Sequence, residues 1–330
     1  MSTAHRIGPR EDTLLVLLAR YVRATTEQLT RHSWSPNSLR YVRKGLARLV
    51  EAGYVEANTG FSQNGKPPFV YSPTMLGWRY AEERHGMPIP ARWRPSEAQI
   101  TDFRDYLHDL AITDLGIAIE RFCREADPLV TFIQFRHDRF LPQTRVPLPD
   151  GTAPSIRLDG FVELHLRRDD SGRKKQRCHL IEIDRGTHYE KALRQKFMLQ
   201  LRYVQDGHYQ RDFGTQSLTY LWICPGGEER VKQLRRMVEA TLREHDAVDF
   251  APLFLFTAED PATCDPISLF TRPCWVVPFE PDPVALLAFP PPATTVRLDR
   301  THYLSPEAYD RFLRATGEEA PVVAAERDMT

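Results

Sequence analysis

The sequence has few of the features that mark secreted proteins, membrane proteins and zinc ribbons. Its five cysteines (Cys123, Cys178, Cys224, Cys264 and Cys274) are scattered, odd in number and form no Cys-x-x-Cys pair. This pattern argues against a disulfide framework and favours reduced thiols. No apolar run approaches the roughly 20 residues that span a bilayer. The first residues also lack the apolar segment of a signal peptide, so we expect a cytoplasmic protein with no membrane partner.

Two further absences narrow the chemistry. The chain has no Gly-Lys-Ser or Gly-Lys-Thr loop to cradle a phosphate, which argues against an ATPase. None of its 11 histidines belongs to a His-x-His pair, so the metal site of a tyrosine relaxase or a rolling-circle initiator is not visible. The formal net charge is zero, and overall charge therefore points to no particular partner.

Length and local charge are more informative. A chain of 330 residues predicts two domains, or one domain with a sizeable appendage. Residues 1–50 hold nine basic residues and only three acidic ones. A basic end on a neutral chain is typical of proteins that contact nucleic acids.

Residues 1–86 have the pattern of a winged helix-turn-helix domain. Apolar periodicity predicts a helix over residues 11–24, and Thr25 with Gln28 can cap a second helix. Ser35 and Pro36 suit the start of a third helix, and Gly53 suits its end. The third helix carries the apolar stripe Leu39, Val42, Leu46, Leu49 and Val50. Strands over residues 54–56 and 69–71 and a helix over 74–84 complete the order of a winged helix.

The polar face of the third predicted helix is a candidate surface for double-stranded DNA. The residues on this face are Asn37, Arg40, Tyr41, Arg43, Lys44 and Arg48. The run over residues 46–55 resembles the end of the recognition helix and the first wing strand of many winged-helix regulators. That resemblance implies a helix in the major groove, with mainly phosphate contacts and one or two contacts to base edges. The alternative is a winged helix used for protein contacts, with its charged face merely solvated.

The rest of the chain predicts an α/β (α+β) domain with a mixed central sheet. The proline-rich residues 87–95 form a linker, and residues 281–330 form a C-terminal extension that we expect to be partly disordered. Between them, residues 96–280 read as helix, strand, strand, strand, helix, strand. The ranges of these six elements are 96–125, 131–140, 156–162, 178–185, 187 onward and 217–224. A helix over 228–245 and strands over 250–257 and 275–279 follow.

Acidic residues mark two neighbouring predicted strands in this region. Asp159 lies on the first, and Glu182 and Asp184 lie on one face of the second, because side chains alternate along a strand. Carboxylate oxygens are the ligands that Mg²⁺ prefers, and Mn²⁺ binds similar sites. The sequence therefore predicts a divalent-metal site formed by Asp159, Glu182 and Asp184.

The order of elements and the acidic residues resemble the PD-(D/E)xK nuclease core. More narrowly, a winged helix joined to Leu-Asp-Gly and Ile-Glu-Ile-Asp-Arg-Gly-Thr strands resembles the replication-relaxation family of plasmids and integrative elements, over residues 10–245. The resemblance implies that Asp159, Glu182 and the Ile183 carbonyl bind the metal. Asp184 stands where the nuclease pattern has lysine, and it either strengthens metal binding or leaves the site inert.

Some members of the nuclease superfamily supply the basic group from the following helix instead. The resemblance therefore implies Lys196 as the catalytic lysine, with Lys191 as the next candidate. It also implies that Glu120 or Asp109 could add a carboxylate, and Gln200 with Tyr203 resembles the helix motif of exonuclease-like relatives. The predicted catalytic residues are thus Asp159, Glu182, Asp184 and Lys196.

Three functions remain open from the sequence. The first is a mobile-element or plasmid DNA-binding protein that cuts DNA with Mg²⁺ or Mn²⁺ during replication, relaxation or transfer. The second is a non-catalytic regulator or replication accessory factor, whose degenerate nuclease fold serves homodimerisation or recruits other replication or transfer proteins. The third is a winged helix attached to a small-ligand sensor, for which the sequence offers no ligand motif.

Overall fold

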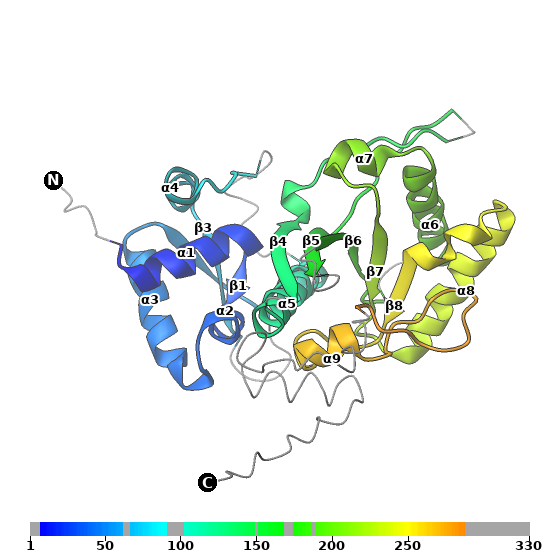
Figure 1. The fold of residues 1–330 in the computed structure, drawn as a ribbon. Helices are drawn as coiled ribbons and strands as arrows, with labels where there is room; N and C mark the ends of the chain where they lie inside the picture. The colour runs from blue at the N-terminus through cyan, green and yellow to red at the C-terminus, as the bar shows by residue number, and fades with distance from the viewer. Residues whose placement is uncertain are drawn as a thin grey trace, which may run out of the picture.

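The fold is built around two β-sheets that are connected by a long helix. A computed structural model describes residues 7–61, 67–90, 102–127, 129–148, 151–167, 174–186 and 189–287. Figure 1 shows the small sheet and its helices on one side of α5 (Phe103–Glu125) and the larger sheet on the other. The mixture of helices, a mixed sheet and a small antiparallel sheet confirms the predicted α/β (α+β) class. In the described ranges, no helix has the length and apolar character needed to cross a membrane.

The N-terminal elements have the topology of a winged helix. The small sheet is antiparallel, with strand order β1-β3-β2, and it packs with three helices. Strand β1 was not predicted; its two residues pair with β3 at Tyr71 and Val70. The elements are α1 (Pro9–Tyr21), β1 (Ala24–Thr25), α2 (Thr26–Ser33), α3 (Leu39–Glu51), β2 (Val55–Thr59), β3 (Phe69–Pro73) and α4 (Met75–His85).

Local sequence explains most of this unit. Thr25 caps α2 in a complete capping box with Gln28, as predicted. The start of the third helix was predicted too early, because a Ser38 N–H to Ser35 O bond of 2.9 Å closes a 3₁₀ turn before α3 begins at Leu39. The buried stripe of α3 is Val42, Gly45, Leu46 and Leu49, whereas Val50 is 36% exposed.

Gly45 lets α1 and α3 approach each other closely. A Cβ at this position would lie 2.7 Å from a side-chain carbon of Leu14 on α1. A larger residue at position 45 would therefore force the Leu14 side chain to move, which favours glycine at this contact. Helix α1 is therefore the inner support on which α3 rests.

The larger sheet has five strands in the order β4-β5-β6-β7-β8. The first three strands are antiparallel, and β6, β7 and β8 are parallel. Its elements are β4 (Val130–His137), β5 (Gly160–Arg167), β6 (Lys174–Ile183), α6 (Glu190–Gln205), α7 (His208–Phe213), β7 (Thr219–Ile223), α8 (Glu228–Glu244), β8 (Phe254–Thr257) and α9 (Pro266–Thr271). The predicted order of helix, three strands, helix and strand is present in α5 through β7.

The two faces of this sheet bury different sets of side chains. Ile181 and Ile183 of β6 share an apolar cluster with α5, whereas Leu180 and Cys178 belong to the cluster that contains residues of α6 and α8. This alternation places Glu182 on the α6 side, as the period of a strand requires. Residues 178–183 of β6 are all buried, so the carboxyl group of Glu182 is held away from water.

Several strand predictions in the second region need correction. The strand predicted over residues 131–140 ends at His137, because residues 138–140 form a 3₁₀ turn, and the strand predicted over residues 178–185 ends at Ile183, so Asp184 follows it. Strand β5 begins at Gly160, so Asp159 precedes the strand. Ile156 and Leu158 are buried, but the Ile156 N–H donates to the Thr144 carbonyl at 2.9 Å and not to a strand of the sheet. Residues 250–253 form a 3₁₀ turn rather than strand, because Pro252 has no N–H to give to a sheet. Residues 275–279 make only isolated bridges, from Trp275 and Val276.

Helix boundaries also differ from the prediction. Helix α6 begins at Glu190, and Tyr189 precedes it without a side-chain capping bond. The predicted cap Thr187 lies outside the described residues, as do residues 91–101 around the predicted linker and helix start, and residues 288–330 of the predicted extension. Within the described residues, α5 begins at Phe103 and is capped by Asp102, which accepts a 2.6 Å bond from Arg104 N–H.

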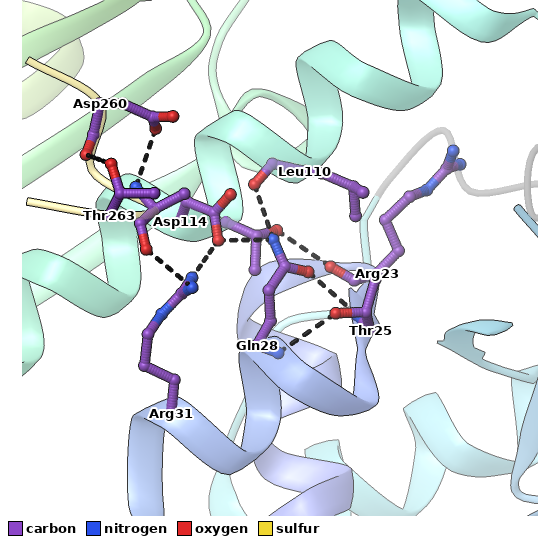
Figure 2. A network of polar contacts seen from close by, with 10 residues as sticks. Arg23, Thr25, Gln28, Arg31, Leu110, Asp114, Asp260 and Thr263 are labelled. Atoms are coloured by element: carbon purple, nitrogen blue, oxygen red, sulfur yellow. Dashed lines mark hydrogen bonds and ion pairs between the residues drawn. The ribbon is translucent and has the colours of Figure 1, made fainter. Parts of the chain in front are cut away.

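A buried polar interface joins α2 to α5. Figure 2 shows Gln28 and Arg31 of α2 reaching Asp114 and the Leu110 carbonyl of α5. Gln28 Nε2 donates to Asp114 at 2.8 Å and to Leu110 O at 2.9 Å. Arg31 also donates to the Ala262 carbonyl beyond β8 at 3.0 Å. The winged helix is thus attached to the larger sheet through specific, partly buried hydrogen bonds.

Candidate functional site

Three separate segments of the chain bring a carboxylate pair, a lysine and a glutamine together. Glu182 on β6 is completely buried. Lys196 Nζ forms an ion pair with Glu182 Oε2, and Gln200 Nε2 donates to Glu182 Oε1 at 2.7 Å. Lys196 and Gln200 are one helical turn apart on α6, so they lie on the same face of that helix. We call Asp159, Glu182, Lys196 and Gln200 the acidic cluster.

Asp159 joins the cluster through the backbone of β6. Its Oδ2 accepts a 2.8 Å hydrogen bond from the Ile183 N–H, and its own N–H donates to the Ile181 carbonyl at 3.1 Å. These two bonds fix Asp159 directly beside Glu182, although 23 positions of sequence separate them. The sequence predicted Asp159 within a strand, whereas the structure places it immediately before Gly160, where β5 begins.

The electrostatics of the cluster come from burial and from the nearby charges. Burial raises the pKa of Glu182; Lys196 opposes the rise, but the Asp159 carboxylate adds to it, and the pKa reaches about 8. Burial alone would also raise the pKa of Asp159, yet the charges of Lys196 and His108 hold it well below its usual value. The Glu182 and Asp159 carboxylates overcome desolvation and raise the pKa of Lys196. The pKa of one carboxyl group is raised and that of the other is lowered, so the two groups resist being ionised together, and the charge of Lys196 favours the ionised form of both.

Asp184 is bound by other partners. Arg230 of α8 makes a bidentate contact with its carboxylate, at 3.0 Å from Nε and 2.9 Å from a terminal nitrogen. The Gly186 N–H donates to the same carboxylate at 2.6 Å. The side chain of Asp184 is fully buried in this ion pair. Although Asp184 was predicted as a metal ligand, the structure places it in a contact that fixes the turn after β6.

His108 is a residue that the sequence analysis did not select. It lies on α5, and its Nε2 is 3.1 Å from Asp159 Oδ2. Burial lowers the pKa of His108, but the carboxylates of Asp159 and Asp109 outweigh this effect and raise it to about 10. His108 is therefore charged at neutral pH. Its neighbour Asp109 was selected as a possible extra carboxylate, and that selection was the one sequence signal pointing to this turn of α5.

The other candidates on the helices have different surroundings. Glu120 lies at the α1–α5 interface, where Arg20, Tyr21 and His32 contact its carboxylate at 2.5, 2.6 and 3.0 Å. Lys191 is exposed on α6. Tyr203 donates to Asp212 at 3.0 Å. None of these three residues contacts the acidic cluster within the described ranges, whereas Gln200, which the sequence paired with Tyr203, is a member of it.

The donor set of the acidic cluster fits a hard divalent cation. Mg²⁺ is commonly bound by one or two carboxylates and keeps several waters. Asp159 and Glu182 supply two such carboxylates, and their mutual repulsion, seen in the raised pKa of Glu182, is what a cation would relieve. Within the described ranges, no group of three or more His, Cys, Asp or Glu side chains is arranged to hold a metal. A cation at this place would have two carboxylate ligands from the acidic cluster, and water would have to complete its shell.

The proposed DNA surface is exposed on α3 and the turn before it. All six candidates, Asn37, Arg40, Tyr41, Arg43, Lys44 and Arg48, are exposed. Arg43 pairs with Glu27 at 3.2 Å, and Arg48 pairs with Glu11 at 3.0 Å. The Arg10 guanidinium lies over the Tyr41 ring, 5.5 Å from its centre. The surface is therefore basic, with one exposed aromatic ring.

Comparison with known proteins gives one match. A family model described as replication-relaxation matches residues 15–218, which is more than half of the chain. The matched segment begins in α1 and ends just before β7, so it contains the proposed DNA surface and the acidic cluster. No curated protein and no solved structure matches the chain. The chain belongs to the replication-relaxation family.

Proposed function

We propose that this protein binds double-stranded DNA through α3 and cuts one strand at the acidic cluster with Mg²⁺ or Mn²⁺. Membership of the replication-relaxation family relates the chain to the replication of plasmids or mobile elements. A strand cut introduced near a selected site would relax supercoiled DNA, a step that such replication or transfer uses. The proposed reaction is the hydrolysis of a phosphodiester bond.

The observation that carries the proposal is the contact between Glu182 and Lys196 beside Asp159. Burying a carboxylate costs free energy, and a buried pair of carboxylates costs more. The chain nevertheless places both at one end of the sheet, where a lysine from α6 meets them. Buried charged groups with strongly shifted pKa values, which cost free energy in folding, are typical of a reaction centre.

Each residue of the cluster has a role in this proposal. Asp159 and Glu182 would hold the cation, which when bound neutralises charge on a phosphate and lowers the pKa of water. Lys196 supplies the positive charge next to Glu182 that the nuclease pattern otherwise places at position 184. Gln200 orients the Glu182 carboxylate by donating to Oε1. Asp184 and Arg230 fix the chain after β6, so that the Ile183 N–H stays directed at Asp159.

The DNA-binding part of the proposal is supported by the exposed face of α3. Arg40 and Lys44 are exposed and form no ion pair within the described part of the chain, so their charges are available to phosphates. Arg43 and Arg48 reach acidic residues of the winged helix and would be held in place by them. Most of these contacts would go to the backbone and give affinity rather than sequence preference.

One observation favours the second candidate, a non-catalytic accessory factor. Both carboxylate oxygens of Glu182 already have hydrogen-bond partners, and Asp184 is bound by Arg230. A site that is satisfied internally can serve as a structural core. In that case the domain would hold a second copy of the chain or recruit other replication or transfer proteins of the element.

Incubation of purified protein with supercoiled plasmid separates the two candidates. The nuclease proposal predicts conversion to open circles in Mg²⁺ or Mn²⁺, and no conversion once EDTA removes the cation. A plasmid carrying the element's own origin is the appropriate substrate, with gel electrophoresis as the measurement. Binding of the plasmid with no strand cut in either metal would support the accessory factor and refute the nuclease.

A further inference from the structure

We infer that Arg23 and Asp109 are positioning residues that hold His108 against Asp159, and so make the acidic cluster depend on the docked winged helix. The inference rests on the proposed function, because it assigns a control of the same centre. It concerns three residues that lie between the small sheet and the larger one. None of the three belongs to the cluster itself.

A continuous series of charge contacts leads from the winged helix to Asp159. A terminal nitrogen of Arg23 lies 3.0 Å from Asp109 Oδ2, and both side chains are at most 10% exposed. Asp109 Oδ1 lies 3.9 Å from His108 Nδ1, an electrostatic contact rather than a hydrogen bond. His108 Nε2 then lies 3.1 Å from Asp159 Oδ2. The imidazolium therefore has a carboxylate at each of its ring nitrogens.

Arg23 reaches this position through a strained turn at the end of α1. The Arg23 N–H donates to the Tyr21 carbonyl at 2.7 Å, and Val22 between them has φ 66° and ψ −43°. This is the geometry of a γ-turn with positive φ, which is rare and costly for a β-branched residue. Such strain persists only where surrounding contacts hold it. The buried Thr113 hydroxyl of α5 supplies one, a 2.9 Å bond to the Arg23 carbonyl.

The same helix supports the proposed DNA surface. Near its start, α1 contacts α3 through the Glu11–Arg48 ion pair and through Leu14 over Gly45. At its end, the Tyr21 hydroxyl donates a 2.6 Å hydrogen bond to the Glu120 carboxylate of α5, and Arg23 forms an ion pair with Asp109. Helix α1 thus contacts the proposed DNA surface near its start and, at its end, the residues behind the acidic cluster. Detachment of the winged helix would break the Arg23–Asp109 ion pair and leave the Asp109 carboxylate without that positive charge.

The interface contains a matched control. Arg31 and Asp114 form a second, partly buried pair between the winged helix and α5, but no contact leads from Asp114 toward Asp159 within the described residues. In Figure 2 the Arg23 guanidinium points away from the Arg31–Asp114 pair. Asp114→Asn and Asp109→Asn therefore make the same chemical change on the same helix, and only the second should affect the cluster.

Two measurements test the inference. In single-turnover nicking at saturating DNA, we expect Asp109→Asn and Arg23→Gln to be slower by roughly 10- to 100-fold, as for residues that orient a reactive group, with unchanged DNA affinity. Asp114→Asn should nick at the wild-type rate. In denaturant unfolding, Asp109→Asn and Asp159→Asn should have non-additive effects, whereas Asp114→Asn and Asp159→Asn should be additive.

The unfolding cycle does not need an active enzyme, so the inference and the proposed function can fail separately. A wild-type protein that never nicks refutes the nuclease, and the cycle still decides the positioning role. Additive effects of Asp109→Asn and Asp159→Asn, or full nicking activity in both Asp109→Asn and Arg23→Gln, would overturn the inference. If Asp109→Asn does not fold, the same cycle is run with Arg23→Gln in its place.

Discussion

Nicking of supercoiled DNA is expected to fall by at least about a thousandfold in Asp159→Asn and in Glu182→Gln, because each change would remove a carboxylate that the proposed function assigns to the cation. A thousandfold corresponds to about 4 kcal/mol of transition-state stabilisation, which is within what a bound metal supplies. Asparagine and glutamine preserve the shape of the buried side chains. The amide oxygen of Gln at position 182 can still accept a bond from Gln200 or Lys196, so we expect both variants to fold.

The control for this prediction is Glu163→Gln. Glu163 lies on β5, is 9% exposed and accepts hydrogen bonds from Gln134 and Gln176, but it makes no contact with the acidic cluster within the described ranges. The Glu163→Gln variant should nick DNA at close to the wild-type rate. DNA affinity, measured by fluorescence anisotropy, should be the same in all three variants. Activity that survives in both Asp159→Asn and Glu182→Gln would show that the cut is made elsewhere.

Loss of DNA binding is the second large effect that we expect, in the double variant Arg40→Ala, Lys44→Ala. Both side chains are exposed on α3 and form no ion pair within the described residues, so their removal should not disturb the fold. Each lost phosphate contact lowers the salt slope of binding by about 1 and weakens binding to all sequences alike. We expect the affinity to fall roughly 10- to 100-fold at moderate salt for the two contacts together.

The matched variant is Lys232→Ala, Arg236→Ala on α8, which removes the same charge from exposed positions. Figure 1 shows α8 and α3 at opposite ends of the molecule. This control should bind DNA as the wild type does. Equal losses in the two double variants would mean that binding depends on overall charge and not on α3. Wild-type affinity in Arg40→Ala, Lys44→Ala would reject α3 as the DNA surface.

Elements with a local signal were predictable from the sequence. The sequence predicted the capping box at Thr25 and Gln28. The alternation of side chains along a strand also predicted that Glu182 lies on the opposite face of β6 from Ile181 and Ile183. Lys196 was selected because a basic residue on the following helix could take the place of the missing lysine, and it does contact Glu182. Its catalytic role stays a prediction.

The parts that could not be predicted depend on contacts between distant segments. Arg230 is 46 positions from Asp184, and nothing in the pattern of α8 distinguishes it from the other charged residues of that helix. His108 is one of several polar residues on a long helix, and nothing in the sequence distinguishes it from the others. Only the contact with Asp159 in the folded chain does so. In the sequence, Arg23 was one of the nine basic residues among the first 50. In the structure it is buried in an ion pair with Asp109. Tertiary packing, rather than periodicity, selects these three residues.

Binding of Mn²⁺ to the acidic cluster is the most direct test of the account. Crystals of the wild type and of Glu182→Gln would be soaked in manganese, and the metal located by its anomalous scattering. The account predicts a peak in contact with Asp159 and Glu182 in the wild type, and its loss in Glu182→Gln. A wild-type cluster that stays metal-free under conditions where the protein nicks DNA, or a peak elsewhere that persists in Glu182→Gln, would contradict it.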